Sequence, residues 1–195
     1  MKRCVIIIFF LFLSFSCSKK KIKDDSMKIK KNSKILKITN NNKFSTGNVI
    51  GTIKNSEITE ASGITISLEN PDHLWTHNDS GHDPILYLIN SKNASYAGKV
   101  LLKDLKRGDW EDIAIGPSIT GEEGNFLYVG DIGDNNSRRI IKKIYFFKEP
   151  NLMNSKNKTI EISDFKTIFF SMNDRVRDAE ALMIDSNSKN IFIIS

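Results

Sequence analysis

Apolar and polar residues alternate along most of the chain after residue 44, with the two-residue period of β-strands. Turns rich in Asn, Asp, Gly and Ser separate the apolar runs, and the 3.6-residue period of helices is nearly absent. The pattern predicts strands or strand-and-turn segments at residues 48–53, 60–67, 73–81, 85–90, 98–104, 109–116, 126–135, 142–148, 166–172, 178–185 and 190–195. We therefore expect an all-β domain over residues 44–195.

One strand of this pattern occurs three times. EASGITIS starts at Glu60, DWEDIAIG at Asp109 and DAEALMID at Asp178, and in each an acid leads into alternating apolar positions. The aligned apolar positions are Ile64, Ile113 and Leu182, followed by Ile66, Ile115 and Ile184. The repeats start 49 and 69 residues apart (60 to 109 to 178), and the polar run EPNLMNSKNK (149–158) in the longer interval is predicted to be a surface loop.

Four short strands per repeat are typical of β-propeller blades. We expect a partial β-propeller, with about two and a half four-stranded blades of a six-bladed ring. Because propellers close with about four to eight blades, the chain is expected to be a fragment of a larger ring. Oligomerisation that completes the ring is the alternative.

The first 17 residues have the pattern of a secretory signal peptide, with a basic start, the apolar run CVIIIFFLFL and then SFSC. Cys17 resembles the lipidated cysteine of bacterial lipoproteins, although Ser14 stands where that pattern prefers Leu. The resemblance implies a membrane-anchored lipoprotein of the cell envelope, exported by the secretory pathway and held at the outer membrane or the periplasmic face. A plain signal peptide with an incidental Cys17 is the alternative.

Residues 18–43 are rich in lysine and are interpreted as a flexible tether, with a surface-bound amphipathic helix as the alternative. Residues 1–40 hold eleven Lys or Arg and two Asp, a charge of +9, so the other 155 residues sum to −3 of the total +6. This distribution argues against a nucleic-acid partner. The two cysteines, Cys4 and Cys17, both precede the expected domain, which excludes a disulfide scaffold.

Acidic residues lie where the innermost strand of each blade would begin, next to the central channel. We expect them to converge at one end of that channel with two polar residues from turns. The predicted metal ligands are Glu60, Asn78, Asp109, Glu111, Asp131, Asp178 and Glu180. Calcium prefers such oxygen ligands, and a cation would offset the repulsion that otherwise raises carboxylate pKa values. Alternatively, these acids pair with backbone amides and basic side chains and tie neighbouring blades together.

Four further residues are predicted to line the rim of the same site: His77, Asp79, Asp134 and Asn135. His77 would act there as a base or phosphate contact, or would only cap its turn. For Asp134 and Asn135, turn formation is favoured over metal binding.

Taken together, ASGI…LWTHNDSG…LYLIN, DWEDIAI…LYVGDIGDN…IYFF and DAEALMID resemble the phytase-like family of secreted bacterial β-propellers, described as having an esterase-like activity of phytase. The resemblance covers about residues 46–195. More distantly, the arrangement is similar to six-bladed lactonase-type propellers, which hold calcium in the channel.

Two functions follow from these patterns. The first is a lipid-anchored propeller with a calcium-binding channel and a binding or scaffold role, whose ligand is unknown. The second is a metal-assisted phosphoester hydrolase of the phytase-like type, with Glu111 or Glu180 as catalytic base or metal ligand. The small number of arginines near the motifs favours the first.

Overall fold

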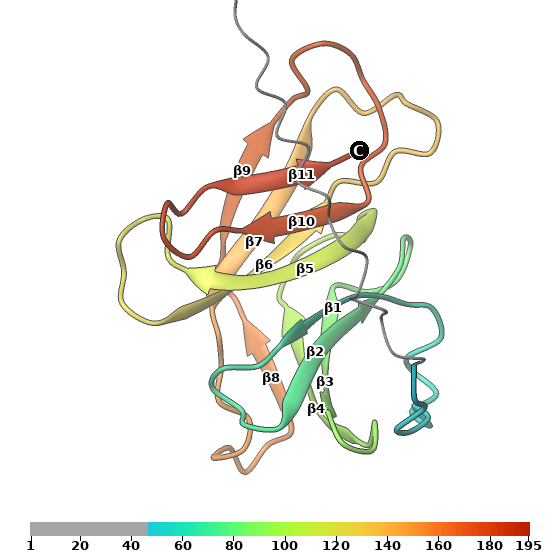
Figure 1. Ribbon diagram of the computed structural model, residues 1–195, viewed down its shortest axis with the longest axis vertical. Coiled ribbons are helices and arrows are strands. Elements are labelled where there is room, and N and C mark those ends of the chain that lie inside the picture. Colours follow the sequence, from blue (N-terminus) through green and yellow to red (C-terminus); the bar gives the residue numbers. More distant parts are fainter. Residues whose placement is uncertain (1–46) are drawn as a thin grey trace, which may run out of the picture. The chain divides into compact units, whose positions relative to one another are not determined.

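The computed structural model describes residues 47–195, which fold into eleven β-strands (Figure 1). This confirms the predicted all-β fold. The predicted signal peptide (1–17), Cys17 and the tether (18–43) lie outside the described residues. Between residues 47 and 195, no helix has the length and apolar character needed to cross a membrane.

The first sheet is an antiparallel meander with one added strand. Its order is β1-β2-β3-β4-β8, and β8 pairs with β4 in parallel. The strands are β1 (Ala61–Ile66), β2 (His73–Asn78), β3 (Ile85–Asn90), β4 (Tyr96–Leu102) and β8 (Thr159–Ile162). The first four are the strands that the sequence predicts for one repeat.

The second and third sheets follow in chain order. The second has the antiparallel order β5-β6-β7-β9, and the third is the pair β10-β11. The strands are β5 (Trp110–Pro117), β6 (Asn125–Asp131), β7 (Lys142–Lys148), β9 (Lys166–Phe170), β10 (Ala181–Ile184) and β11 (Ile191–Ile194). In the described part of the chain the three sheets form no closed ring, so the propeller stays a proposal.

Two apolar cores join the sheets face to face. The first core lies between the first and second sheets and includes Trp75 and Leu88 on one side and Ile113 and Val129 on the other. The second core lies between the second and third sheets, where Ala114 and other residues of the second sheet face Leu182 and its neighbours. β5 contacts both β1 and β10, so the acid-led strand of each repeat lies beside the next one (Figure 1).

One sequence prediction of local structure is wrong, and another is confirmed only in part. Residues 48–53 form no strand, and they are largely exposed. The segment after β7 is not simply a surface loop, because Glu149 and Leu152 are buried and Leu152 belongs to the first core. The Glu149 carboxylate accepts hydrogen bonds from the amides of residues 68 and 69 and from the Trp75 indole, which holds this segment against the first sheet.

Candidate metal-binding site

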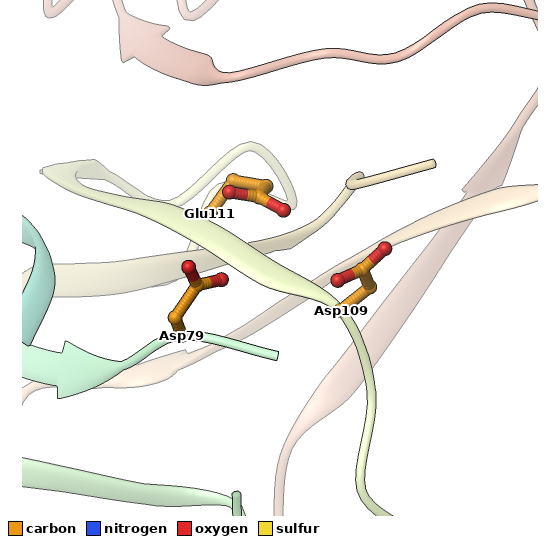
Figure 2. A group of neighbouring side chains, drawn as sticks. All are labelled: Asp79, Asp109 and Glu111. Atoms are coloured by element: carbon orange, nitrogen blue, oxygen red, sulfur yellow. The ribbon is translucent and has the colours of Figure 1, made fainter. Parts of the chain in front are cut away.

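Three carboxylates converge where the first and second sheets meet. Asp79 directly follows β2, Asp109 directly precedes β5, and Glu111 is the second residue of β5. One oxygen from each lies within 4.8 Å of the others. Figure 2 shows the three groups around a common space. All three side chains are partly buried. We refer to Asp79, Asp109 and Glu111 as the acidic triad.

Backbone hydrogen bonds hold the two chain segments of the acidic triad side by side. The amide of Asp79 donates to the Glu60 carbonyl at 2.9 Å, which extends the β1–β2 pairing beyond the end of β2. Two residues later, the Gly81 amide donates to the Gly108 carbonyl at 3.1 Å. This contact joins the turn after β2 to the residue before Asp109, so the position of the triad is set by the main chain.

Gly133 lies directly against the acidic triad. Its amide donates to the Asp109 carbonyl at 3.1 Å, and a Cβ atom at this position would overlap the carboxylates of Asp109 and Glu111. Only glycine therefore allows the turn after β6 to approach these acids so closely. The sequence signal for this contact was the GDIGDN turn, but the sequence did not show which strand the glycine would face.

The third sheet brings two more acids to the same place. Glu180 is exposed, and its carboxyl group lies close enough to Glu111 and Asp178 for both to affect its pKa. Asp178 accepts hydrogen bonds from the amides of Asp134, at 2.5 Å, and Ala179, at 3.0 Å. Glu180 is therefore an available neighbour of the acidic triad, whereas Asp178 is partly used to tie the third sheet to the second.

The electrostatics of the site oppose full ionisation. Burial, followed by the charges of Asp79, Glu180, Asp109 and Asp178, raises the pKa of Glu111 to about 8. Burial also raises the pKa of Asp109, although Arg139 and a hydrogen bond from Ser80 act in the opposite direction. The pKa of Glu180 is raised by burial and by Asp178. A divalent cation would favour the ionised form of all three groups.

Asp131, predicted as a ligand, supports the site indirectly. Its buried carboxylate accepts hydrogen bonds from the Asp109 amide at 3.0 Å, the Arg139 guanidinium at 2.6 Å and the Tyr145 hydroxyl at 3.0 Å. Arg139 also donates to the Gly133 carbonyl at 2.7 Å. Because its charge is already compensated, Asp131 fixes the backbone of Asp109 and lies outside the acidic triad.

Asn78 and Glu60 also lie outside the acidic triad. The amide oxygen of Asn78 accepts from the backbone of Thr59 and Glu60 at 3.0 and 3.2 Å, and its nitrogen donates to the Glu57 carbonyl at 2.7 Å. Asn78 therefore fixes the chain that enters β1. The Glu60 side chain is exposed and lies 3.7 Å from His82 Nδ1.

The other predicted rim residues have separate places. His77 is fully buried beside Trp110 and bonds to the Asn78 carbonyl, and its burial lowers its pKa. It is therefore a core residue rather than a rim base. Asn135 is exposed in the turn after β6. Among the rim residues, Asp79 alone belongs to the acidic triad.

Asp134 is a buried turn former. It accepts from the amides of Arg138 and Arg139, each at 2.8 Å, and lies 3.8 Å from the Lys142 ammonium. Burial alone would raise the pKa of Asp134, but these amides and Lys142 lower it overall. Lys142 is itself buried, donates to the Ile132 carbonyl at 2.5 Å, and has a pKa lowered by burial.

The role of Asp112 was not predicted from the sequence. Its carboxylate accepts from the Leu182 amide at 2.8 Å and so connects β5 to β10. On the other side of β5, the Ser62 hydroxyl donates to the Glu111 carbonyl at 2.9 Å. The signal was present in the acid-rich DWEDIAIG run, but the partner of Asp112 lies 70 residues further along the chain.

Comparison with known proteins gives no significant match: none among family models, none among curated proteins and none among solved structures. Function must therefore be inferred from the geometry of the acidic triad. Three carboxylates that share one space can hold a metal ion, and their oxygens are the ligand type that calcium and magnesium prefer.

Proposed function

We propose that this protein binds a divalent cation, calcium in particular, at the acidic triad, and that it acts as a binding or scaffold module of the cell envelope. The observation that carries the proposal is the convergence of the Asp79, Asp109 and Glu111 oxygens within 4.8 Å of one another. Calcium takes about six to eight oxygen ligands in flexible geometry. Glu180, backbone carbonyls and water would complete such a shell.

The fold proposed to carry this site is a β-propeller-type arrangement. Sheets that stack in chain order, with the first strand of each beside the first strand of the next, support it. In a propeller these first strands surround the central channel. The triad, Glu180 and Asp178 all lie at the starts of such strands or in adjoining turns, as a site at one end of a channel requires.

Thermal unfolding of the full chain with calcium or with a chelator tests the cation site. At a calcium concentration about 100-fold above Kd, binding contributes about 2.7 kcal/mol, which corresponds to roughly 5–10 °C in melting temperature. Glu111→Gln removes a ligand and should abolish this shift. In chelator the same variant should be more stable than the wild type by about 1 kcal/mol after allowance for solvent screening, because it removes a crowded carboxylate.

Glu123→Gln is the matched control, since Glu123 is exposed in the turn between β5 and β6. It should keep the full calcium shift. Calorimetric titration of calcium, with magnesium in parallel, gives the stoichiometry and identifies the preferred ion. An equal calcium shift in the wild type and in Glu111→Gln would contradict the proposal.

Phosphoester hydrolysis is the second candidate, because Glu111 has the pKa of a group that can accept a proton near neutral pH. Arg139 is the basic group that pairs with the triad, 3.9 Å from Asp109, and it is engaged by Asp131 and Gly133. A phosphate would have to compete for it, which favours binding over catalysis. Turnover of p-nitrophenyl phosphate esters that is lost in Glu111→Gln, with the fold retained, would reverse this preference.

A further inference from the structure

An arginine side chain brings a positive charge to the edge of the acidic triad. Nη1 of Arg139 lies 3.9 Å from Asp109 Oδ2, and the Arg139 side chain is 29% exposed. Among residues 47–195, no other basic side chain forms an ion pair with a member of the triad within 4.0 Å. A cation that enters the triad therefore meets the charge of Arg139.

Three hydrogen bonds fix this guanidinium group. Nη1 donates to the Gly133 carbonyl at 2.7 Å. Nη2 donates to the Asp131 carboxylate at 2.6 Å and to the Asp131 carbonyl at 3.4 Å. Gly133 is also the residue that lies against the carboxylates of Asp109 and Glu111. The turn that accepts a hydrogen bond from Arg139 is thus the turn that contacts the triad.

The buried Asp131 carboxylate keeps Arg139 from moving away. Asp131 is 2% exposed, and a buried carboxylate without a charged partner is strongly disfavoured. Its other hydrogen-bond donors, the Tyr145 hydroxyl and the Asp109 amide, are neutral. Withdrawal of Arg139 would leave the charge of Asp131 uncompensated. The guanidinium group therefore keeps its place when a cation enters the triad.

We propose that Arg139 is a fixed positive charge that limits the cation affinity of the acidic triad, more strongly for ions of higher charge. This inference rests on the proposed cation site. The Coulomb energy of two charges is proportional to each of them. Arg139 therefore opposes a trivalent ion more than a divalent ion of similar size.

Arg139 also has an effect that favours cation binding. Its charge lowers the pKa of Asp109, which burial raises, and the ionised carboxylate is the form that binds a cation. This second effect disappears when the pH is high enough to ionise all three acids. Calcium titrations at pH 9 therefore measure the repulsion from Arg139 with little contribution from protonation.

Calorimetric titration of charge variants of the full chain tests the inference. Arg139→Gln removes the charge and keeps an amide donor for Asp131, so at pH 9 it should bind calcium about tenfold more tightly than the wild type. Arg139→Lys keeps the charge and should stay within about threefold of the wild type. Arg138→Gln is the matched control, because Arg138 is exposed beside Arg139. It should change the affinity by less than about twofold.

Terbium, a trivalent ion, distinguishes the charge of Arg139 from a structural role. Its binding is measured by luminescence at pH 7, with calcium titrated at the same pH. If Arg139→Gln increases the calcium affinity by about tenfold, it should increase the terbium affinity by about 30-fold, since the repulsion is one and a half times larger. Loss of a residue with only a structural role would weaken the binding of both ions.

Weaker or unchanged calcium binding in Arg139→Gln, with the fold retained by circular dichroism, would overturn the inference and leave the cation site in place. If Arg139→Gln does not fold, Arg139→Lys decides. A loss of more than about tenfold in that variant, despite its retained charge, would show that Arg139 acts through its hydrogen bonds. A wild-type chain that binds no calcium would contradict the proposed function and this inference with it.

Discussion

The carboxyl group of Glu111 lies among other acids, and burial together with their charges raises its pKa to about 8. Calcium needs the ionised group, so at neutral pH binding must displace a proton. Calcium binding should therefore become weaker as the pH falls, because the neighbouring acids favour the protonated form of Glu111. Backbone contacts through Gly81 and Gly133 bring these acids close together.

The pH dependence of calcium binding follows from this pKa. Affinity should rise by about tenfold per pH unit up to about pH 8 if one proton is displaced, and then level off. Calorimetric titrations at pH 6, 7, 8 and 9 measure it. An affinity that is flat over this range would show that Glu111 takes no part in binding.

The stability of the calcium-free protein should fall as the pH rises, whereas its calcium affinity should increase. A raised pKa means that the folded chain binds a proton at Glu111 more tightly than the unfolded chain does. This contribution is fully present below the ordinary pKa of 4.5 and is lost as pH rises to about 8. Melting curves in chelator should therefore show lower stability at pH 8 than at pH 5, and Glu111→Gln should reduce the difference.

At the residue scale, the sequence predicted two of the three members of the acidic triad as ligands and Asp79 as a rim residue. The sequence repeat was sufficient to predict Asp109 and Glu111 as ligands, because equivalent strands place their leading acids at the same end of the sheets. It could not distinguish Asp131 and Asn78 from ligands, since both are the last residues of strands that end near the acidic triad. Their roles depend on Arg139, Tyr145 and the chain before β1, which are distant in sequence.

The connection from β7 to β8 shows how an element can be missed. EPNLMNSKNK is polar, and its composition predicted a surface loop. In the structure Glu149 is buried and satisfies donors from the turn after β1 and from Trp75, up to 82 residues away, and β8 then adds to the edge of the first sheet. No local pattern encodes a partner at that distance.

Replacing Glu149 tests this interpretation of the connection. Glu149→Ala leaves four hydrogen-bond donors unpaired: the Ser67 hydroxyl, the amides of residues 68 and 69, and the Trp75 indole. At about 1–3 kcal/mol for an unsatisfied buried group, we expect the free energy of unfolding to fall by about 3 kcal/mol or more. Chemical denaturation measures it.

Glu161→Ala on β8 is the control for this substitution, because Glu161 is exposed. It should change stability by less than about 0.5 kcal/mol. Similar losses in the two variants would show that the buried carboxylate does not hold the connection to the first sheet.

For the whole molecule, the hydrophobic pattern was enough to predict most strands and their division into units of four, four and two, with two exceptions: the strand predicted at residues 48–53 does not form, and β8 was not predicted. Alternation fixes which residues face a core, and the repeats fix which strands are equivalent. Closure into a ring is not encoded in this way, because it depends on how many sheets meet. The propeller therefore remains a proposal, supported by the stacking of the three sheets.

The predicted lipid anchor can be tested on the full chain in a bacterial host. Cys17→Ser should move the protein from the membrane fraction to the soluble fraction, because a lipidated N-terminal cysteine would hold it by several acyl chains. Cys4→Ser, within the predicted signal peptide, should leave the distribution unchanged. Labelling with a radioactive fatty acid gives direct evidence of acylation. Equal distributions of wild type and Cys17→Ser would favour a plain signal peptide.

The burial of Lys142 gives the second sheet an internal reporter of opening. Its ammonium group is inaccessible to solvent and is held by the Ile132 carbonyl, whereas Lys143, next to it on β7, is partly exposed. An acylating reagent for primary amines should therefore modify Lys143 quickly in the native protein and Lys142 only when the sheet separates. The ratio of the two modification rates, read by peptide mass spectrometry, would measure how often this part of the molecule opens.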